Sequence, residues 1–197
     1  ENGMAKQEDI PTFGHRIHKE AQRMITLVSD ILQLSELDGM SKQQENSPTA
    51  DFVPVDLGVL VKDVATNMTV NARKAYITLQ YKVQPVTVRG SHDLLTELVT
   101  NLCDNAIRYN RPLSCGTNAD GCPYFCVEDN GIGIPQDSQS RVFERFYRVD
   151  KSRSKATGGT GLGLAIVKHI AVLHGARIDL ESTVGTGTTI RIIFPKM

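Results

Sequence analysis

The chain has 197 residues, of which 40% are hydrophobic, so it is long enough for one or two domains that each enclose an apolar core. Its 22 basic and 22 acidic residues cancel, which argues against nucleic acid or an anionic membrane surface as a partner. No run approaches the roughly 20 apolar residues that a membrane span needs. The cysteines at 103, 115, 122 and 126 match no common zinc spacing, so we expect reduced structural thiols in a cytosolic protein.

The first predicted element is one long helix over residues 9–38. Its apolar residues recur at steps of three and four, namely Ile17, Ala21, Met24, Val28, Ile31 and Leu34. Pro11 suits the first turn of a helix, and Gly39 after Asp38 suits its end. A lone helix cannot bury so wide a stripe, so we expect a partner helix from this chain or from another. The polar, unpatterned residues that follow predict a linker at 41–51.

The remainder alternates between strand and helix patterns. Helices are predicted over 56–74, 91–109 and 162–174, and strands over 52–55, 77–83, 86–88, 124–128, 177–181 and 188–194. Residues 110–122 are turn-rich, and 130–158 read as a long loop with one helical turn near Phe143. The closing hairpin and the mixed order predict an α+β fold, a two-layer sandwich with helices on one face of a largely antiparallel sheet.

The helix 91–109 carries the first candidate motif, Asn-Leu-Cys-Asp-Asn-Ala at 101–106. Glu97, Asn101 and Asn105 are four residues apart and share one face, with Arg108 near it. Asparagine is unfavourable in a helix interior, so two asparagines on one stripe suggest a functional site. A polar stripe that faces solvent has the same pattern. An amide oxygen suits Mg²⁺, and an arginine suits phosphates.

Two glycine-rich motifs follow. Asp-Asn-Gly-Ile-Gly-Ile at 129–134 comes after a strand, and its carboxylate suits an exocyclic amine such as that of adenine. Gly-Thr-Gly-Leu-Gly-Leu at 159–164 opens a helix, whose N–H groups and dipole attract phosphate. It matches neither the Rossmann nor the Walker spacing. An ordinary strand exit and a flexible hinge are the structural alternatives.

Between these motifs lies Phe-Glu-Arg-Phe at 143–146. Its aromatic residues suit a loop held against a core, and the basic residues after it suit a lid over phosphates. A solvated basic loop has the same composition.

With these four segments in this order, residues 52–197 resemble the catalytic, ATP-binding domain of bacterial sensor histidine kinases, most closely the phosphate-regulon type. The segments resemble the N, G1, F and G2 boxes, and Gly-Thr-Gly-Thr at 185–188 resembles the last glycine box. The resemblance implies the fold that this domain shares with gyrase and Hsp90 ATPases, preceded here by a long helix. It also implies ATP and Mg²⁺ as ligands.

By the same resemblance, Asn101 would hold Mg²⁺, and Glu97 and Arg108 would be the residues closest to the chemistry. Nucleotide contacts are expected from Asn105, Arg108, Tyr109, Asp129, Gly131, Gly133, Ile134, Phe146, Tyr147, Arg148, Lys151, Arg153, Gly159, Thr160, Gly161, Leu162, Gly163, Leu164 and Thr188.

Residues 1–40 resemble what remains of the dimerisation and phosphoacceptor hairpin, chiefly its second helix. The His-Glu-Leu-Arg/Lys-Thr-Pro box of the first helix does not occur in this sequence, and His15 and His18 read as surface residues of a helix. We therefore expect a truncated, cytoplasmic part of a kinase that is unable to phosphorylate itself. The resemblance further implies a response regulator receiver domain as partner, an intact protein that is a homodimer, and a membrane link only through segments absent from this chain.

Three functions follow from these observations. The first is transfer of the ATP γ-phosphoryl group to a histidine outside this chain, for relay to an aspartate of the regulator. The second is a nucleotide-binding interaction module without turnover. The third is an ATP-hydrolysing switch of the gyrase or Hsp90 kind, against which the Phe-Glu-Arg-Phe segment argues.

Overall fold

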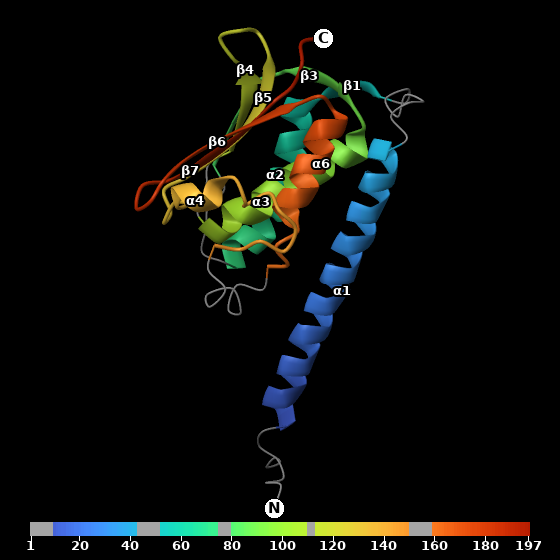
Figure 1. Ribbon diagram of the computed structural model, residues 1–197, viewed down its shortest axis with the longest axis vertical. Helices are drawn as coiled ribbons and strands as arrows, with labels where there is room; N and C mark the ends of the chain where they lie inside the picture. Colours follow the sequence, from blue (N-terminus) through green and yellow to red (C-terminus); the bar gives the residue numbers. More distant parts are fainter. Residues whose placement is uncertain (1–9, 43–51, 75–79, 110–112, 150–158) are drawn as a thin grey trace, which may run out of the picture.

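The structure is a computed structural model that describes residues 10–42, 52–74, 80–109, 113–149 and 159–197. Figure 1 shows a long helix beside a mixed body of helices and strands. In chain order the elements are α1 (Ile10–Lys42), β1 (Val53–Asp56), α2 (Leu57–Lys74), β2 (Tyr81–Val83), β3 (Thr87–Gly90), α3 (His92–Tyr109), β4 (Leu113–Thr117), β5 (Pro123–Asp129), α4 (Gln136–Gln139), α6 (Gly163–Leu173), β6 (Arg177–Thr183) and β7 (Gly187–Ile193).

The strands form one main sheet of five strands in the order β2-β4-β5-β7-β6. Every neighbouring pair is antiparallel except β2 and β4, which run parallel. Strands β1 and β3 pair separately as an antiparallel ribbon. Helices α2, α3 and α6 pack against the main sheet. The predicted α+β two-layer sandwich preceded by a long helix is therefore confirmed.

The core lies between the sheet and this helix layer, and strand alternation fixes which side chains enter it. On β5, Phe125 and Val127 are fully buried against the helices, whereas Glu128 between Val127 and Asp129 is exposed. On β7, Ile190 and Ile192 are buried in the same cluster. Asp129 follows Val127 by two residues, so its side chain lies on the helix side of the sheet.

Two helix starts show how local sequence sets the boundaries. The Asp56 carboxylate accepts a hydrogen bond from the Val59 backbone N–H at 3.0 Å, which caps α2. The Ser91 hydroxyl accepts one from the Leu94 N–H at 3.4 Å, which caps α3. Because α3 begins there, its buried residues, among them Leu98 and Leu102, face the core and Glu97 and Asn101 lie toward one edge.

The structure differs from the predicted elements at three places. Helix α1 continues through Gly39 to Lys42, because a single glycine costs only about 1 kcal/mol and Leu37 and Asp38 are held by tertiary contacts. The turn-rich segment contains a strand, β4, which pairs with β5 as a hairpin. The helical turn of the long loop is α4, ahead of Phe143 rather than at it.

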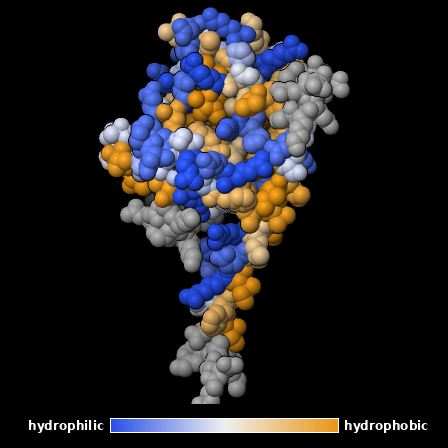
Figure 2. Space-filling view, in the orientation of Figure 1, coloured by the Kyte–Doolittle hydropathy of each residue, from blue (hydrophilic) through white to orange (hydrophobic). Residues whose placement is uncertain are grey.

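Only part of the predicted apolar stripe of α1 is buried. Leu34 is 3% exposed and packs on the body, whereas Ile17 and Met24 are 70% and 66% exposed. Figure 2 shows this stripe as apolar surface along the projecting part of the helix. Helix α6 is the expected partner helix for the Leu34 end of the stripe only, and among the described residues Ile17, Met24 and Val28 stay exposed. The predicted linker falls largely on 43–51, outside those residues, so the division of domains stays a prediction.

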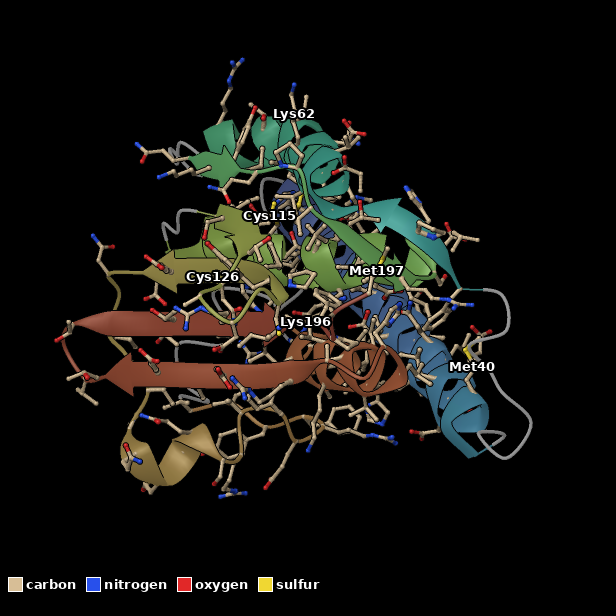
Figure 3. The ribbon with its side chains drawn as sticks, turned by 90° about the horizontal axis from the view of Figure 1, so that it is seen from above. Met40, Lys62, Cys115, Cys126, Lys196 and Met197 are labelled. Carbon is tan, nitrogen blue, oxygen red and sulfur yellow. The ribbon has the colours of Figure 1, made fainter. Side chains whose placement is uncertain are left out.

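The four cysteines are free thiols. Cys103 is buried in α3, and this burial raises the pKa of its thiol to about 12. Cys115 on β4 and Cys126 on β5 lie on neighbouring strands (Figure 3), and burial raises both their pKa values. Among the helices of the described residues, none combines the length and the apolar character that crossing a bilayer requires.

A buried histidine joins the ends of several elements. His174, at the end of α6, stacks on Phe52 with ring centroids 4.5 Å apart. Its Nδ1 lies 2.8 Å from the Ile170 carbonyl oxygen, and its Nε2 accepts the Ser91 backbone N–H at 3.2 Å. A neutral ring protonated at Nδ1 satisfies both contacts. Burial lowers the pKa of His174 below its usual value.

This lowered pKa predicts a pH-dependent stability. The neutral imidazole stabilises the fold above the unfolded-state pKa of about 6.5, and this contribution is lost as the pH falls toward the folded-state pKa. Denaturant unfolding at pH 7.5 and 5.5 should therefore show a smaller loss for His174→Gln than for wild type. Equal losses in the two proteins would contradict the prediction.

Candidate functional site

The first part of the site is the polar edge of α3. Glu97, Asn101 and Asn105 are half-buried along it, and the Asn101 side-chain amide donates to the Glu97 backbone carbonyl at 3.2 Å. This bond orients the amide so that its oxygen, Oδ1, points away from the helix backbone. The side chains of Arg108 and Tyr109 lie outside the described part of the structure, as do Lys151 and Arg153.

Asn101 meets the glycine-rich segment where α6 begins. A Cβ atom on Gly163 would lie only 2.9 Å from Asn101 Oδ1, so a side chain there would displace the amide. The structure thus brings the motif at 101–106 against the motif at 159–164. An amide oxygen beside the bare N–H groups of a helix start is an arrangement that suits a phosphate and its metal ion.

The second part of the site lies where β5 ends. The Asp129 carboxylate accepts a hydrogen bond from the Gly131 N–H at 2.7 Å, which fixes its orientation. Thr188 of β7 is the register partner of Asp129 and is 3% exposed. These two predicted residues therefore lie side by side on neighbouring strands.

The loop after Asp129 is tied to the closing hairpin by residues that the sequence motifs do not contain. The Ser182 hydroxyl accepts from the Ile134 N–H at 2.8 Å and lies 2.9 Å from the Thr188 hydroxyl. The Gln139 side-chain amide donates to the carbonyls of Ile134 and Ser182. Sequence analysis missed Ser182 and Gln139 because their partners lie 48 and five residues away, and no local spacing marks them.

The third part is the loop between α4 and α6. The Phe146 N–H donates to the Gly161 carbonyl at 3.0 Å, and the Arg148 guanidinium donates to the Gly159 carbonyl, so this loop is bound to the glycine-rich segment. Tyr147 is half-buried, with the Arg141 guanidinium carbon 4.4 Å from its ring centroid. The expectation that the aromatic residues hold the loop on a core fails for Phe146, whose side chain is 56% exposed.

Glu97 lies where the helix layer meets α1. The Gln33 side-chain amide of α1 donates a hydrogen bond to the Glu97 carboxylate. Burial raises the pKa of Glu97, the Gln33 bond lowers it, and the neighbouring carboxylates of Asp30 and Glu36 raise it further. A carboxylate of raised pKa beside a phosphate-type cradle is suited to accept or orient a proton.

Two further residues of helix α1 make polar contacts with this region. The Thr160 hydroxyl donates to the Asp30 carboxylate at 2.7 Å. The Arg145 guanidinium donates to both oxygens of Asp38 at 2.7 Å, and His169 Nε2 of α6 lies 2.9 Å from Asp38 Oδ1. The Arg145 hydrogen bond is the largest cause that lowers the pKa of Asp38. Asp30, Gln33 and Asp38 lie on one helix face at intervals of three to five residues. This spacing is the sequence signal from which they could have been predicted.

Comparison with known proteins agrees with this arrangement. Residues 90–197 match the family described as histidine kinase-, DNA gyrase B- and HSP90-like ATPase. The match spans more than half of the chain and contains every motif described above, so the chain belongs to this family.

Sensor histidine kinases are among the similar relatives of this chain. The chain is 38% identical to the sensor-like histidine kinase SenX3 of Mycolicibacterium smegmatis, over 96% of this chain and 49% of that protein. It is 34% identical to the sensor protein kinase WalK of Staphylococcus aureus, over 99% of this chain and 47% of that protein. The chain thus spans about half the length of these curated relatives.

Solved structures lead to the same class. Full-length ShkA, crystallised in complex with AMPPNP, superposes with a TM-score of 0.72 at 25% identity, over 98% of this chain and 39% of ShkA. The mycobacterial sensor histidine kinase MprB superposes with a TM-score of 0.63 at 27% identity, over 73% of this chain and 97% of that structure. The fold of this chain is therefore that of a histidine kinase ATP-binding catalytic domain.

The close approach of the loop after Asp129 to β6 can be tested with two glycine substitutions. Gly133 has φ +69°, and a Cβ there would lie 2.1 Å from the Thr183 carbonyl oxygen, whereas Gly185 has φ +81° with open space around it. Left-handed strain alone should cost Gly185→Ala about 1–2 kcal/mol of unfolding free energy. Gly133→Ala adds a steric clash and should cost about 2–5 kcal/mol in total. Equal costs in denaturant unfolding would contradict the described approach of this loop to β6.

Proposed function

We propose that this chain is the part of a sensor histidine kinase that binds ATP and transfers its γ-phosphoryl group to a histidine. The observation that supports this most directly is the meeting of Asn101 with the glycine-rich start of α6 at Gly163. The relatives are sensor kinases over nearly the whole of this chain, which supports the same class of reaction.

In this proposal the adenine lies at the end of β5. The Asp129 carboxylate, oriented by the Gly131 N–H, accepts a hydrogen bond from the adenine amine. Thr188 and the Ser182 hydroxyl beside it support the adenine at that end of the strand. The backbone of the loop at 131–134 then lies along the base, where Gly131 presents no side chain, and Gly133 allows the same loop to approach Thr183 of β6.

The phosphates lie at the other end, between α3 and the start of α6. The backbone N–H groups of residues 159–164 and the α6 dipole favour their charge. Mg²⁺, when bound, would share phosphate oxygens and offset their charge, and the residue that fits it is Asn101 through Oδ1. The Glu97 carboxylate, which Gln33 and Asn101 contact, accepts a proton or orients a water in this proposal. Asn105, Arg108, Tyr109 and the lid residues Lys151 and Arg153 complete the proposed contacts.

The acceptor histidine belongs to a segment outside residues 1–197, because no acceptor box occurs in this sequence. We accordingly propose that this chain alone does not phosphorylate itself. The phosphoryl group passes in the whole protein to an aspartate of a response regulator receiver domain. The whole protein acts as a homodimer, and this part of it lies in the cytoplasm, where ATP and the regulator are found. Residues 1–40 would belong to its dimerisation and phosphotransfer hairpin, and 52–197 to the catalytic domain.

Nucleotide binding is the first test. Loss of a hydrogen bond to a charged group costs about 1.5–3 kcal/mol, so Asp129→Asn should weaken ATP binding about 10- to 150-fold in calorimetric titration with Mg²⁺. Glu128→Gln removes the same charge from the neighbouring, exposed residue and should leave the affinity unchanged. Absence of saturable ATP binding by wild type would overturn the proposed function. ATP affinity that does not depend on Mg²⁺ would favour a binding module without turnover.

Phosphoryl transfer is tested in trans. The chain is mixed with radiolabelled ATP and with a sensor kinase that carries an acceptor histidine box but an inactivated nucleotide site. Acid-labile label should accumulate on that partner with the wild-type chain. With the Asn101→Ala chain it should not accumulate. Release of phosphate at a steady rate without any acceptor would instead identify an ATP-hydrolysing switch.

A further inference from the structure

Helix α1 has a second face, which shares only Leu34 with its apolar stripe. This docking face consists of Leu27, Asp30, Gln33, Leu34, Leu37 and Asp38, at the spacing of one side of a helix. Leu34 and Leu37 are 3% and 1% exposed, and the helix packs along α6. Figure 1 shows this end of α1 beside the body, while the other end projects from it.

The polar residues of the docking face all contact segments of the proposed phosphate end. Gln33 binds Glu97 on α3, Asp30 binds Thr160 in the glycine-rich segment, and Asp38 binds Arg145 in the loop before it. Three separate segments of the site are therefore held by one helix face. Docking of α1 and the arrangement of the site are for this reason physically linked.

The charges of the docked state oppose a triphosphate. The Asp30 carboxylate accepts the Thr160 hydroxyl at 2.7 Å, and this hydroxyl in turn lies 3.3 Å from the Leu162 N–H at the start of α6. Asp30 and Glu36 both act on the half-buried carboxylate of Glu97, so three negative groups gather at this end. A further phosphate brought there meets like charge at short range and competes with Asp30 for Thr160.

We propose that docked α1 opposes binding of nucleoside triphosphates, and that Asp30 is the residue that lets the site discriminate between ATP and ADP. The inference rests on the proposed function. Binding of the γ-phosphate takes the Thr160 hydroxyl from Asp30 and weakens the docking of α1. By linkage, the factor by which ATP binding weakens the docking equals the factor by which docked α1 weakens ATP binding, so a variant with weaker docking binds ATP more tightly.

The test measures Mg-ATP and Mg-ADP affinities of the full 197-residue chain by calorimetry. Asp30→Asn should bind Mg-ATP about five- to tenfold more tightly than wild type and Mg-ADP within twofold of it. The matched control is Glu20→Gln, which removes a carboxylate from the exposed part of the same helix. It should change neither affinity.

A second measurement follows the docking of α1 directly. An undocked single helix is marginally stable in water, so amide hydrogen exchange over residues 27–38 should be faster in wild type with Mg-ATP than with Mg-ADP. Exchange that is equally slow with both nucleotides overturns the inference.

The outcomes separate the two proposals. Weaker ATP binding by Asp30→Asn, an equal change for ADP, or unchanged affinities overturn the inference alone, since they show that Asp30 supports the site or does not act on it. Absence of ATP and ADP binding by wild type and both variants overturns the proposed function and the inference with it.

Discussion

The site depends above all on how closely the start of α6 approaches α3. Gly163 has no side chain, and Asn101 occupies the space that a Cβ would take. Any larger residue at 163 would separate the amide from the helix start, and the two halves of the proposed phosphate end would no longer face each other. Buried residues of both helices, such as Leu98 and Ile166, set this distance by packing in one core. The chemistry of the site is thus a consequence of helix packing.

Much of the fold follows from local sequence because its determinants are local. Asp56 and Ser91 cap the helices that follow them, and the alternation around Phe125 assigns β5 and its buried face. The signal of β4 is too short to stand out, since its alternation consists only of Leu113 and Cys115 on either side of Ser114, and pairing with β5 completes the strand. The end of α1 is missed for a related reason, because Leu37 and Asp38 are held by tertiary contacts and the helix continues past Gly39 to Lys42.

The candidate site is predictable in part for the same reason. Residues that act through the backbone, such as Gly163, or through position on a helix, such as Asn101, leave a spacing that sequence analysis detects. The position of Asp30 on the helix face that carries Leu34 leaves a spacing in the sequence, but its contact with Thr160 does not, because Thr160 lies 130 residues away along the chain. For Phe146 the sequence predicts a contact that the structure lacks: the motif suggests an aromatic side chain held against the core, but Phe146 is exposed.

The site described here is divided between two supports. Gln139 and Ser182 fasten the loop after Asp129 to the β6–β7 hairpin, so the proposed adenine end is part of the sheet. The glycine-rich segment and the loop before it are fastened to α1 and α6, so the phosphate end is part of the helix layer. A displacement of α1 therefore reaches one end of a bound nucleotide and not the other. Under the proposed function, the base serves as a fixed point from which the position of the phosphates is varied.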